Sequence, residues 1–420
     1  MYKLQTLKNG LRLLTVPVSG TKTATILVMV GTGSKYETRE NNGISHFLEH
    51  MFFKGTEKRP NAMALSSELD SVGAEFNAFT GKEYTGFYVK TDAKQIELGM
   101  DIVSDMLLYS LFDEKEIEKE KGVIIEEINM YEDNPIYHIE DIFEQCLYGD
   151  QPAGWETIGT KENIKKFKRE DFLNYLTSQY GAGNSVVCLA GDIKNETVEK
   201  IEKYFSNLKR SEFKNKLATE EKQTEPNALV NFKKTDQANL SLGARAFPVG
   251  HPDEDILRVI AILLGGSMSS RLFHSLREER GLAYYVRTGT EFYTDSGYIT
   301  TQAGVPVDKI EDAIKVILEE YNRLKNEPVS KEELQKVKDL IRGRLTIQLE
   351  SSDANASWYA RQMVLRNEAI TPLEYLKKVN HVTAKDIKRV AESIFKNESL
   401  NLAVIGPYGE EKNFKNLLKL

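Results

Sequence analysis

Residues 41–53 read NNGISHFLEHMFF, and the interpretation of the whole chain starts from this segment. Its apolar residues recur at helical spacing, so we expect a helix here. The candidate caps at its start are Asn41, Asn42 and Ser45. On a helix of about 3.6 residues per turn, side chains four positions apart lie on one face. His46 and His50 are therefore expected to point the same way and to be able to converge on one ion.

The order His46-x-x-Glu49-His50 is the inverted form of the H-E-x-x-H zinc motif. Neutral histidine nitrogens are zinc ligands, and a catalytic zinc site has three protein ligands and a water. Glu49 lies beside the second histidine, where its carboxylate could take a proton from that water as a general base. Two histidines on a helix can also be polar residues at an interface. Because the chain contains only six histidines, we favour the metal interpretation.

A helix expected at 113–131 offers the third ligand. Glu126 and Glu127 are neighbouring candidates that differ in their position around the helix. Glu126 falls on a solvated, polar stripe, whereas Glu127 shares a partly apolar stripe with Ile124 and Tyr131. A carboxylate on a buried face needs a partner, and a metal ion is one. The helical phase therefore predicts Glu127 as the ligand.

Glu120 lies about two turns before Glu127 on the same stripe. It could form a hydrogen bond to a metal ligand or to the water. The alternative is ordinary ion pairing, because glutamate and lysine alternate through much of 114–121. From the sequence alone, both interpretations of Glu120 stay open.

Composition describes a large globular protein of 420 residues, long enough for two to four domains. The net charge of −7 argues against nucleic acid and anionic membrane as partners. The two cysteines form no disulfide framework, which favours a reducing compartment. No signal segment and no run of about 18 apolar residues is visible. We therefore expect a cytoplasmic or matrix-like protein, and of the two we favour the cytoplasm.

Local patterns predict most of the remaining elements of the first half. Residues 4–18 alternate as a hairpin that turns at 8–10, and 24–30 form a nearly continuous apolar run typical of a strand buried on both faces. Further strands are expected at 73–80 and 84–89, and further helices at 62–72, 93–109 and 135–147.

The chain also repeats itself. The series of elements in 164–192 matches the series in 376–406 at an offset of about 210–215 residues, half the chain. We therefore expect two copies of one α+β fold, a first half at 1–212 and a second at 228–420, joined by a polar linker at 213–227. The second copy has no counterpart of the metal ligands. Taken alone, its Arg277 and Tyr284 would be a surface charge and a strand aromatic.

The chain resembles the pitrilysin or insulinase type of peptidase, family M16, and especially its short members such as the mitochondrial processing peptidases. The resemblance covers essentially all 420 residues. The segments that carry it are 46–50, 73–80, 123–128 and 276–284. The first and third of these together are specific.

The resemblance implies two homologous α/β-sandwich halves that form a clam-shell around a chamber admitting unfolded peptides. It implies one Zn²⁺ per chain on His46, His50 and Glu127. It also implies that Glu49 is the general base and that Glu120 supports catalysis. The reaction implied is zinc-assisted hydrolysis of a peptide bond without a covalent intermediate.

The resemblance also assigns residues that would contact substrate. An edge strand at Asn77-Ala78-Phe79 would pair with the substrate backbone. From the second half, Arg277 and Tyr284 would hold the substrate and stabilise the oxyanion. Phe273, one turn before Arg277, would line the pocket.

Relatives of this length usually assemble two chains, and some divide the zinc motif and the Arg/Tyr pair between subunits. This chain has both, so a self-sufficient homodimer is expected. The long glycine-rich loop of the non-catalytic subunit of the processing peptidases is reduced here to Gly265-Gly266, so presequence specificity is not expected. The alternative function is a non-catalytic peptide-binding or assembly subunit of a processing-peptidase-like complex, although such relatives typically lose metal ligands that are all present here.

Overall fold

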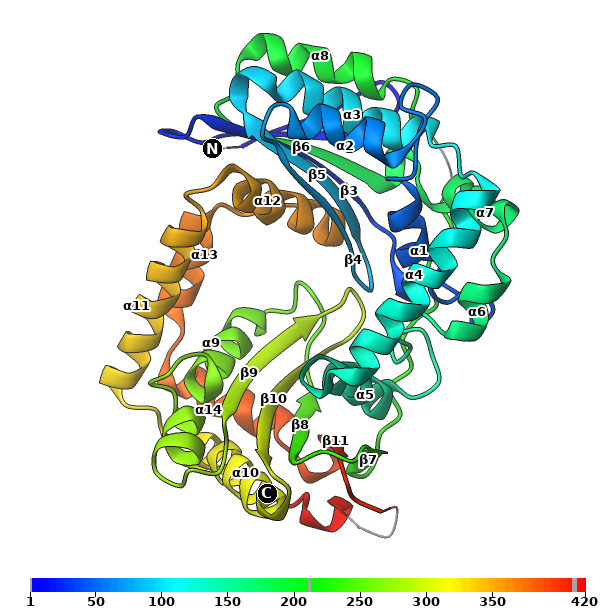
Figure 1. The fold of residues 1–420 in the computed structure, drawn as a ribbon. Coiled ribbons are helices and arrows are strands. Elements are labelled where there is room, and N and C mark those ends of the chain that lie inside the picture. The colour runs from blue at the N-terminus through cyan, green and yellow to red at the C-terminus, as the bar shows by residue number, and fades with distance from the viewer. Residues whose placement is uncertain (1, 211–212, 410–413) are drawn as a thin grey trace. The chain divides into compact units, whose positions relative to one another are not determined.

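The computed structural model describes residues 2–210, 213–409 and 414–420 (Figure 1). The chain divides into two compact units, each assembled from three separate segments. Unit 1 comprises Met1–Asn129, Glu156–Leu217 and Leu345–Thr371, and unit 2 comprises Met130–Trp155, Ala218–Arg344 and Pro372–Leu420. Among the described residues, no helix has the length and apolar character needed to cross a membrane.

Unit 1 contains a six-stranded sheet in the order β1-β2-β6-β3-β5-β4. Its strands are β1 (Lys3–Thr6), β2 (Arg12–Pro17), β3 (Thr23–Val30), β4 (Glu75–Thr80), β5 (Thr85–Asp92) and β6 (Ser185–Gly191). The pair β2 and β6 is parallel, and all other neighbours are antiparallel. The predicted hairpin and the predicted strands of the first half are thus confirmed, and β4 forms one edge of the sheet.

Both faces of this sheet are covered, because β3 is buried along nearly its whole length. Leu27 and Met29 point to one face of the sheet and pack with α12 (Ser352–Arg366). Ile26 points to the opposite face and lies next to Gly99 of α3 (Ile96–Tyr109). Each fully buried aliphatic side chain of this kind contributes roughly 1.5–3 kcal/mol. The other helices with most of their residues in unit 1 are α1 (Ile44–Met51), α2 (Ala62–Asp70), α4 (Glu114–Asp133), α6 (Lys161–Lys166), α7 (Arg169–Gln179) and α8 (Asn195–Phe205).

Unit 2 contains a five-stranded sheet in the order β7-β11-β8-β10-β9. Its strands are β7 (Asn227–Phe232), β8 (Gln237–Arg245), β9 (Tyr285–Phe292), β10 (Gly297–Pro306) and β11 (Leu400–Gly406). The first pair is parallel and the rest are antiparallel. This arrangement repeats the order and directions of β2-β6-β3-β5-β4, so the topology confirms the two copies of one fold.

One face of the second sheet packs against α5 (Pro135–Tyr148), through side chains that include Ile139 and Phe143. The other face forms a large core with the remaining helices of the unit. These are α9 (Glu254–Gly265), a π-helix at Phe273–Glu278, α10 (Ile310–Asn326), α11 (Lys331–Gln348), α13 (Pro372–His381) and α14 (Ala384–Ile394).

The compact units differ from the predicted halves by an exchange of two helices. Helix α5 lies between β5 and β6 in the chain but packs on the sheet of unit 2, and α12 lies between β10 and β11 but packs on the sheet of unit 1. The boundaries at 1–212 and 228–420 rest on the repeat in the sequence, which cannot show where an exchanged helix packs.

Residues 213–226 of the predicted linker contain no helix or strand, and its last residue, Asn227, is the first residue of β7. Residues 211 and 212, at the predicted end of the first half, lie outside the described residues. Each end of the segment is held by its own unit: the Lys214 N–H donates to the Ser178 carbonyl in unit 1, and the Thr219 N–H donates to Asp295 in unit 2.

Candidate active site

The helix with both histidines, α1, is fixed at its N-terminus by a buried carboxylate. The N-cap position is Gly43, with φ of 99°, and a Cβ there would lie 2.8 Å from the Ile158 carbonyl oxygen, so no capping side chain fits. Glu37, from the preceding loop, instead accepts from the backbone N–H groups of Gly43 and Ser45, both at 2.8 Å. A carboxylate at this end also complements the helix dipole.

This finding corrects the predicted caps. Neither Asn41 nor Ser45 caps the helix through its side chain, because α1 has no side-chain cap hydrogen bond. Asn42 contributes indirectly, since its amide donates to Glu37 at 3.0 Å. Burial raises the pKa of Glu37, and the donors around it offset part of that effect.

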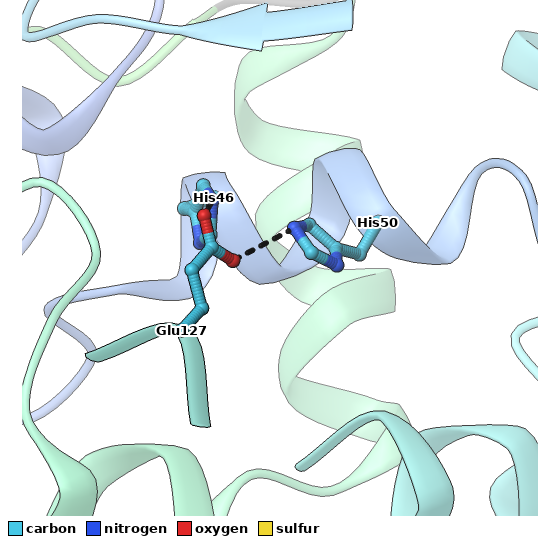
Figure 2. Close-up of side chains that lie close together, drawn as sticks. All are labelled: His46, His50 and Glu127. Atoms are coloured by element: carbon cyan, nitrogen blue, oxygen red, sulfur yellow. Dashed lines mark ion pairs between the residues drawn. The ribbon is translucent and has the colours of Figure 1, made fainter. Parts of the chain in front are cut away.

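The side chains of His46, His50 and Glu127 point toward one another from α1 and α4 (Figure 2). Glu127 Oε1 lies 3.6 Å from His46 Nε2, and Glu127 Oε2 lies 3.5 Å from His50 Nε2. One ligand atom from each residue lies within 4.8 Å of the others. The three side chains are 14, 22 and 24% exposed, so the group is accessible from solvent but largely enclosed.

The two carboxylate–imidazole separations, one to each oxygen of Glu127, are close to the spacing of ligand atoms around a tetrahedral ion. Two ligand atoms that each lie about 2.1 Å from a tetrahedral zinc are about 3.4 Å apart, close to the distances measured here and longer than an ordinary hydrogen bond. The donor set of two imidazoles and one carboxylate suits zinc and leaves a fourth position for water. The neighbouring Glu126 is exposed, as its stripe on the helix predicts.

Glu120 supports one of the two histidines. Its Oε1 lies 2.8 Å from His50 Nδ1, and its Oε2 lies 2.5 Å from Lys54 Nζ. An acceptor on Nδ1 fixes the orientation of the ring and leaves Nε2 with a lone pair for a metal. His46 differs, because its buried Nδ1 has no hydrogen-bond partner in the part of the chain that the structure describes.

The ionisation of the two glutamates follows from their neighbours. Burial acts to raise the pKa of Glu127, but the hydrogen bond and charge of His46 and the charge of His50 hold it below the usual value. Burial likewise acts to raise the pKa of Glu120, but the hydrogen bonds and charges of His50 and Lys54 outweigh burial and hold this pKa below the usual value. Both carboxylates are therefore ionised at neutral pH, as a metal site requires.

Glu49 lies on α1 beside His50, and its carboxylate contacts the edge of the sheet. The Thr80 hydroxyl, at the end of β4, donates to Glu49 Oε2 at 2.5 Å. Both side chains are half-buried. The general-base candidate is thus held by a neighbour on a strand. It lies next to His46, His50 and Glu127, which we call the metal group.

The predicted substrate residues Asn77, Ala78 and Phe79 lie on β4, which pairs with β5 and forms an edge of the sheet. The ring of Phe79 covers Gly86, where an added Cβ would meet the ring at 2.2 Å. Asn77 is exposed, and its side chain accepts from the Ala78 N–H at 2.9 Å. The edge needed for strand addition is present, although a pairing peptide would have to displace this Asn77 contact to use that N–H.

The predicted residues of the second copy lie together in unit 2. The Arg277 guanidinium lies 5.0 Å from the ring centroid of Phe273 and 5.8 Å from that of Tyr284, distances typical of cation–π contacts. Arg277 and Phe273 belong to a π-helix, a rare element that is frequent at functional sites. Phe273 is buried, whereas Tyr284 is 72% exposed. Their action on a substrate stays a prediction.

Comparison with known proteins matches two consecutive stretches of the chain to models of one peptidase family. Residues 12–161 match the family described as insulinase (peptidase family M16), and residues 166–341 match the peptidase M16 inactive domain. The uncharacterized zinc protease YmxG of Bacillus subtilis is 36% identical over 409 residues, which are 97% of this chain and 99% of that protein. This chain belongs to peptidase family M16. An uncharacterized zinc protease of Rickettsia felis is 34% identical over 408 residues, 97% of this chain and 98% of its own length.

Two solved structures share the M16 fold over nearly the whole chain. A protease from Helicobacter pylori aligns with a TM-score of 0.91 at 24% identity, covering 97% of this chain and 99% of that one. A peptidase M16 inactive domain from Pseudomonas fluorescens aligns with a TM-score of 0.88 at 18% identity, covering 98% and 99%. At these identities the likeness concerns the fold, and it confirms the predicted pair of α+β halves.

Three residues near the site of this M16 chain were not predicted from the sequence: Glu37, Lys54 and Thr80. Lys54 is the only one with a local signal, because it follows His50 by four positions, about one helical turn. Glu37 and Thr80 reach α1 from a loop and from a strand, so their contacts depend on the tertiary fold.

Proposed function

We propose that the chain is a zinc-dependent endopeptidase that hydrolyses unfolded peptides. The observation that carries this proposal is the convergence of His46, His50 and Glu127 at separations close to the spacing of ligand atoms around a tetrahedral ion, with Glu49 on the same helix. The relatives named as zinc proteases match this chain over nearly their whole length and support the choice of metal. One Zn²⁺ per chain is expected.

A zinc ion held by these three residues would polarise the scissile carbonyl and lower the pKa of the attacking water. Glu49 takes the proton from this water and delivers it to the leaving amine. Glu120, bonded to His50 Nδ1, keeps that ring in one orientation. Arg277 and Tyr284 are proposed to stabilise the negative charge that develops on the carbonyl oxygen.

Unfolded peptides are the proposed substrates because addition to β4 requires an extended backbone. Asn77, Ala78 and Phe79 would supply this edge, and backbone pairing would accept many sequences. Phe273 is proposed to line a substrate pocket.

A cytoplasmic homodimer remains our proposal for the assembled protein. It is supported by the presence of the zinc motif and the Arg277/Tyr284 pair in one chain. Light scattering of the purified protein would give its mass, and a stable monomer with full activity would remove the dimer from the proposal.

Metal analysis with a cleavage assay tests the proposed activity. We expect near one zinc per chain and cleavage of an unstructured, quenched-fluorescent peptide that stops on chelation and returns with zinc. Glu49→Gln should abolish cleavage and keep zinc, whereas Glu40→Gln, at an exposed position before the same helix, should change neither. No bound metal and no cleavage after zinc addition would favour a non-catalytic peptide-binding or assembly subunit instead.

A further inference from the structure

The contact between Thr80 and Glu49 joins two parts of the candidate site that have separate tasks. Thr80 is the last residue of β4, and helix α1, with Glu49, lies against this strand (Figure 1). The hydroxyl donates to Glu49 Oε2 at 2.5 Å. Among the described residues, no other hydrogen bond to the Glu49 carboxylate is present, so Oε1 is available to a water.

A general base works only when its carboxylate is held within hydrogen-bond reach of the proton it removes. A glutamate side chain has several rotatable bonds, and its loss of rotamer freedom opposes any single orientation. Thr80 is well suited to hold it, because a β-branched side chain on a strand has a restricted χ1. Its backbone is also fixed, since Thr80 pairs with Thr85 in the ladder between β4 and β5.

The same strand contains the proposed substrate edge. Asn77, Ala78 and Phe79 precede Thr80 directly, so the hydroxyl that holds Glu49 and the backbone that would pair with a peptide belong to one rigid element. A displacement of about 1 Å between a catalytic group and its substrate can lower a rate by about a hundredfold. A base that is fixed to the strand that binds substrate avoids such a displacement.

We propose that Thr80 is a positioning residue that orients the Glu49 carboxylate relative to a peptide bound along β4. The inference rests on the proposed peptidase function and adds a residue to it. Thr80 itself is not proposed to take the proton from the water or to bind the metal; it acts through Glu49.

The test compares Thr80→Val, which keeps the shape but removes the hydroxyl, with Thr80→Ser, which keeps the hydroxyl. We expect Thr80→Val to lower kcat by at least about tenfold, with KM and zinc content unchanged, because only the orientation of the base is lost. Thr80→Ser should keep kcat within about threefold of the wild type. The matched control is Thr91→Val in β5, which removes a buried hydroxyl that has no partner among the described residues and should leave kcat unchanged.

A second measurement does not depend on turnover. In the inactive Glu49→Gln background, the Kd of the peptide should be the same with Thr80 and with Val at this position, because the hydroxyl is not proposed to hold the substrate. Zinc content reports whether the Thr80→Val protein is folded around its metal group.

The outcomes separate this inference from the function on which it rests. An active wild type together with an unchanged kcat in Thr80→Val would refute the role of Thr80 alone. A loss of kcat that Thr80→Ser fails to restore, or an equal rise in KM, would replace positioning by a structural or substrate-binding role. A zinc-loaded wild type that cleaves no peptide would overturn both proposals.

Discussion

Replacing Glu37 by glutamine should loosen helix α1, which presents the candidate metal ligands His46 and His50. Glu37 is 2% exposed and accepts from two backbone N–H groups, of Gly43 and Ser45, and from the Asn42 amide. In Glu37→Gln one carboxylate oxygen becomes an NH₂ group. This NH₂ group would face N–H donors that now bond to the carboxylate, so donor would meet donor. A buried donor left without an acceptor costs about 1–3 kcal/mol, and hydrogen bonds to a charged group are worth about 1.5–3 kcal/mol. We therefore expect unit 1 to lose about 2–4 kcal/mol of unfolding free energy.

The assay can report on unit 1 alone, which is necessary because a chain with two units need not unfold in one step. Trp155 and Trp358 are the two tryptophans, and Trp358 lies in α12, within unit 1. In a Trp155→Phe background, urea unfolding followed by fluorescence reports the unit that holds the metal group. Glu40→Gln, at a fully exposed site, is the matched control and should not shift the midpoint. Equal stability of Glu37→Gln and the control would show that the carboxylate does not hold α1.

Three further outcomes follow from the geometry of the site and the core. Glu127→Ala should abolish stoichiometric zinc, measured by mass spectrometry of the metal, whereas Glu126→Ala should retain it; the reverse result would show that the helical phase was misjudged. Glu120→Ala should weaken zinc binding about 10- to 100-fold in a competitive titration, because His50 Nδ1 loses its acceptor, and an unchanged affinity would limit Glu120 to its ion pair with Lys54. Burial raises the pKa of Cys146 to about 12, so about one thiol in ten thousand is ionised at pH 8. A thiol reagent should therefore leave Cys146 unmodified until the protein unfolds, and rapid native labelling would contradict the buried position.

The metal group could be predicted in detail because its information is local. His46, Glu49 and His50 lie within one and a half turns of a helix, and the choice of Glu127 over Glu126 depends only on the period of another helix. The structure brings His46, His50 and Glu127 together as that reasoning requires. The strands and helices of the first half also follow from local periodicity.

The contacts that hold this group in place could not be predicted in the same way. The cap of α1 is supplied by Glu37 because Gly43 has no room for a side chain, and that restriction comes from the distant carbonyl of Ile158. The bond from Thr80 to Glu49 likewise joins residues on different elements. A single sequence predicts which residues share a face of a helix, but not which loop or strand lies against that face.

The exchange of α5 and α12 has a consequence for how such a chain can be divided and how it can originate. A fragment ending in the linker would keep its own sheet but lack the helix that covers one face, and it would expose the apolar residues packed there, such as Leu27 and Met29. Two complementary fragments, once mixed, could each supply the missing helix to the other. For the same reason, a half-length chain with one repeat could bury its sheet only by swapping this helix with a second copy. The present chain has the connectivity expected if the two subunits of such a swapped dimer became fused end to end.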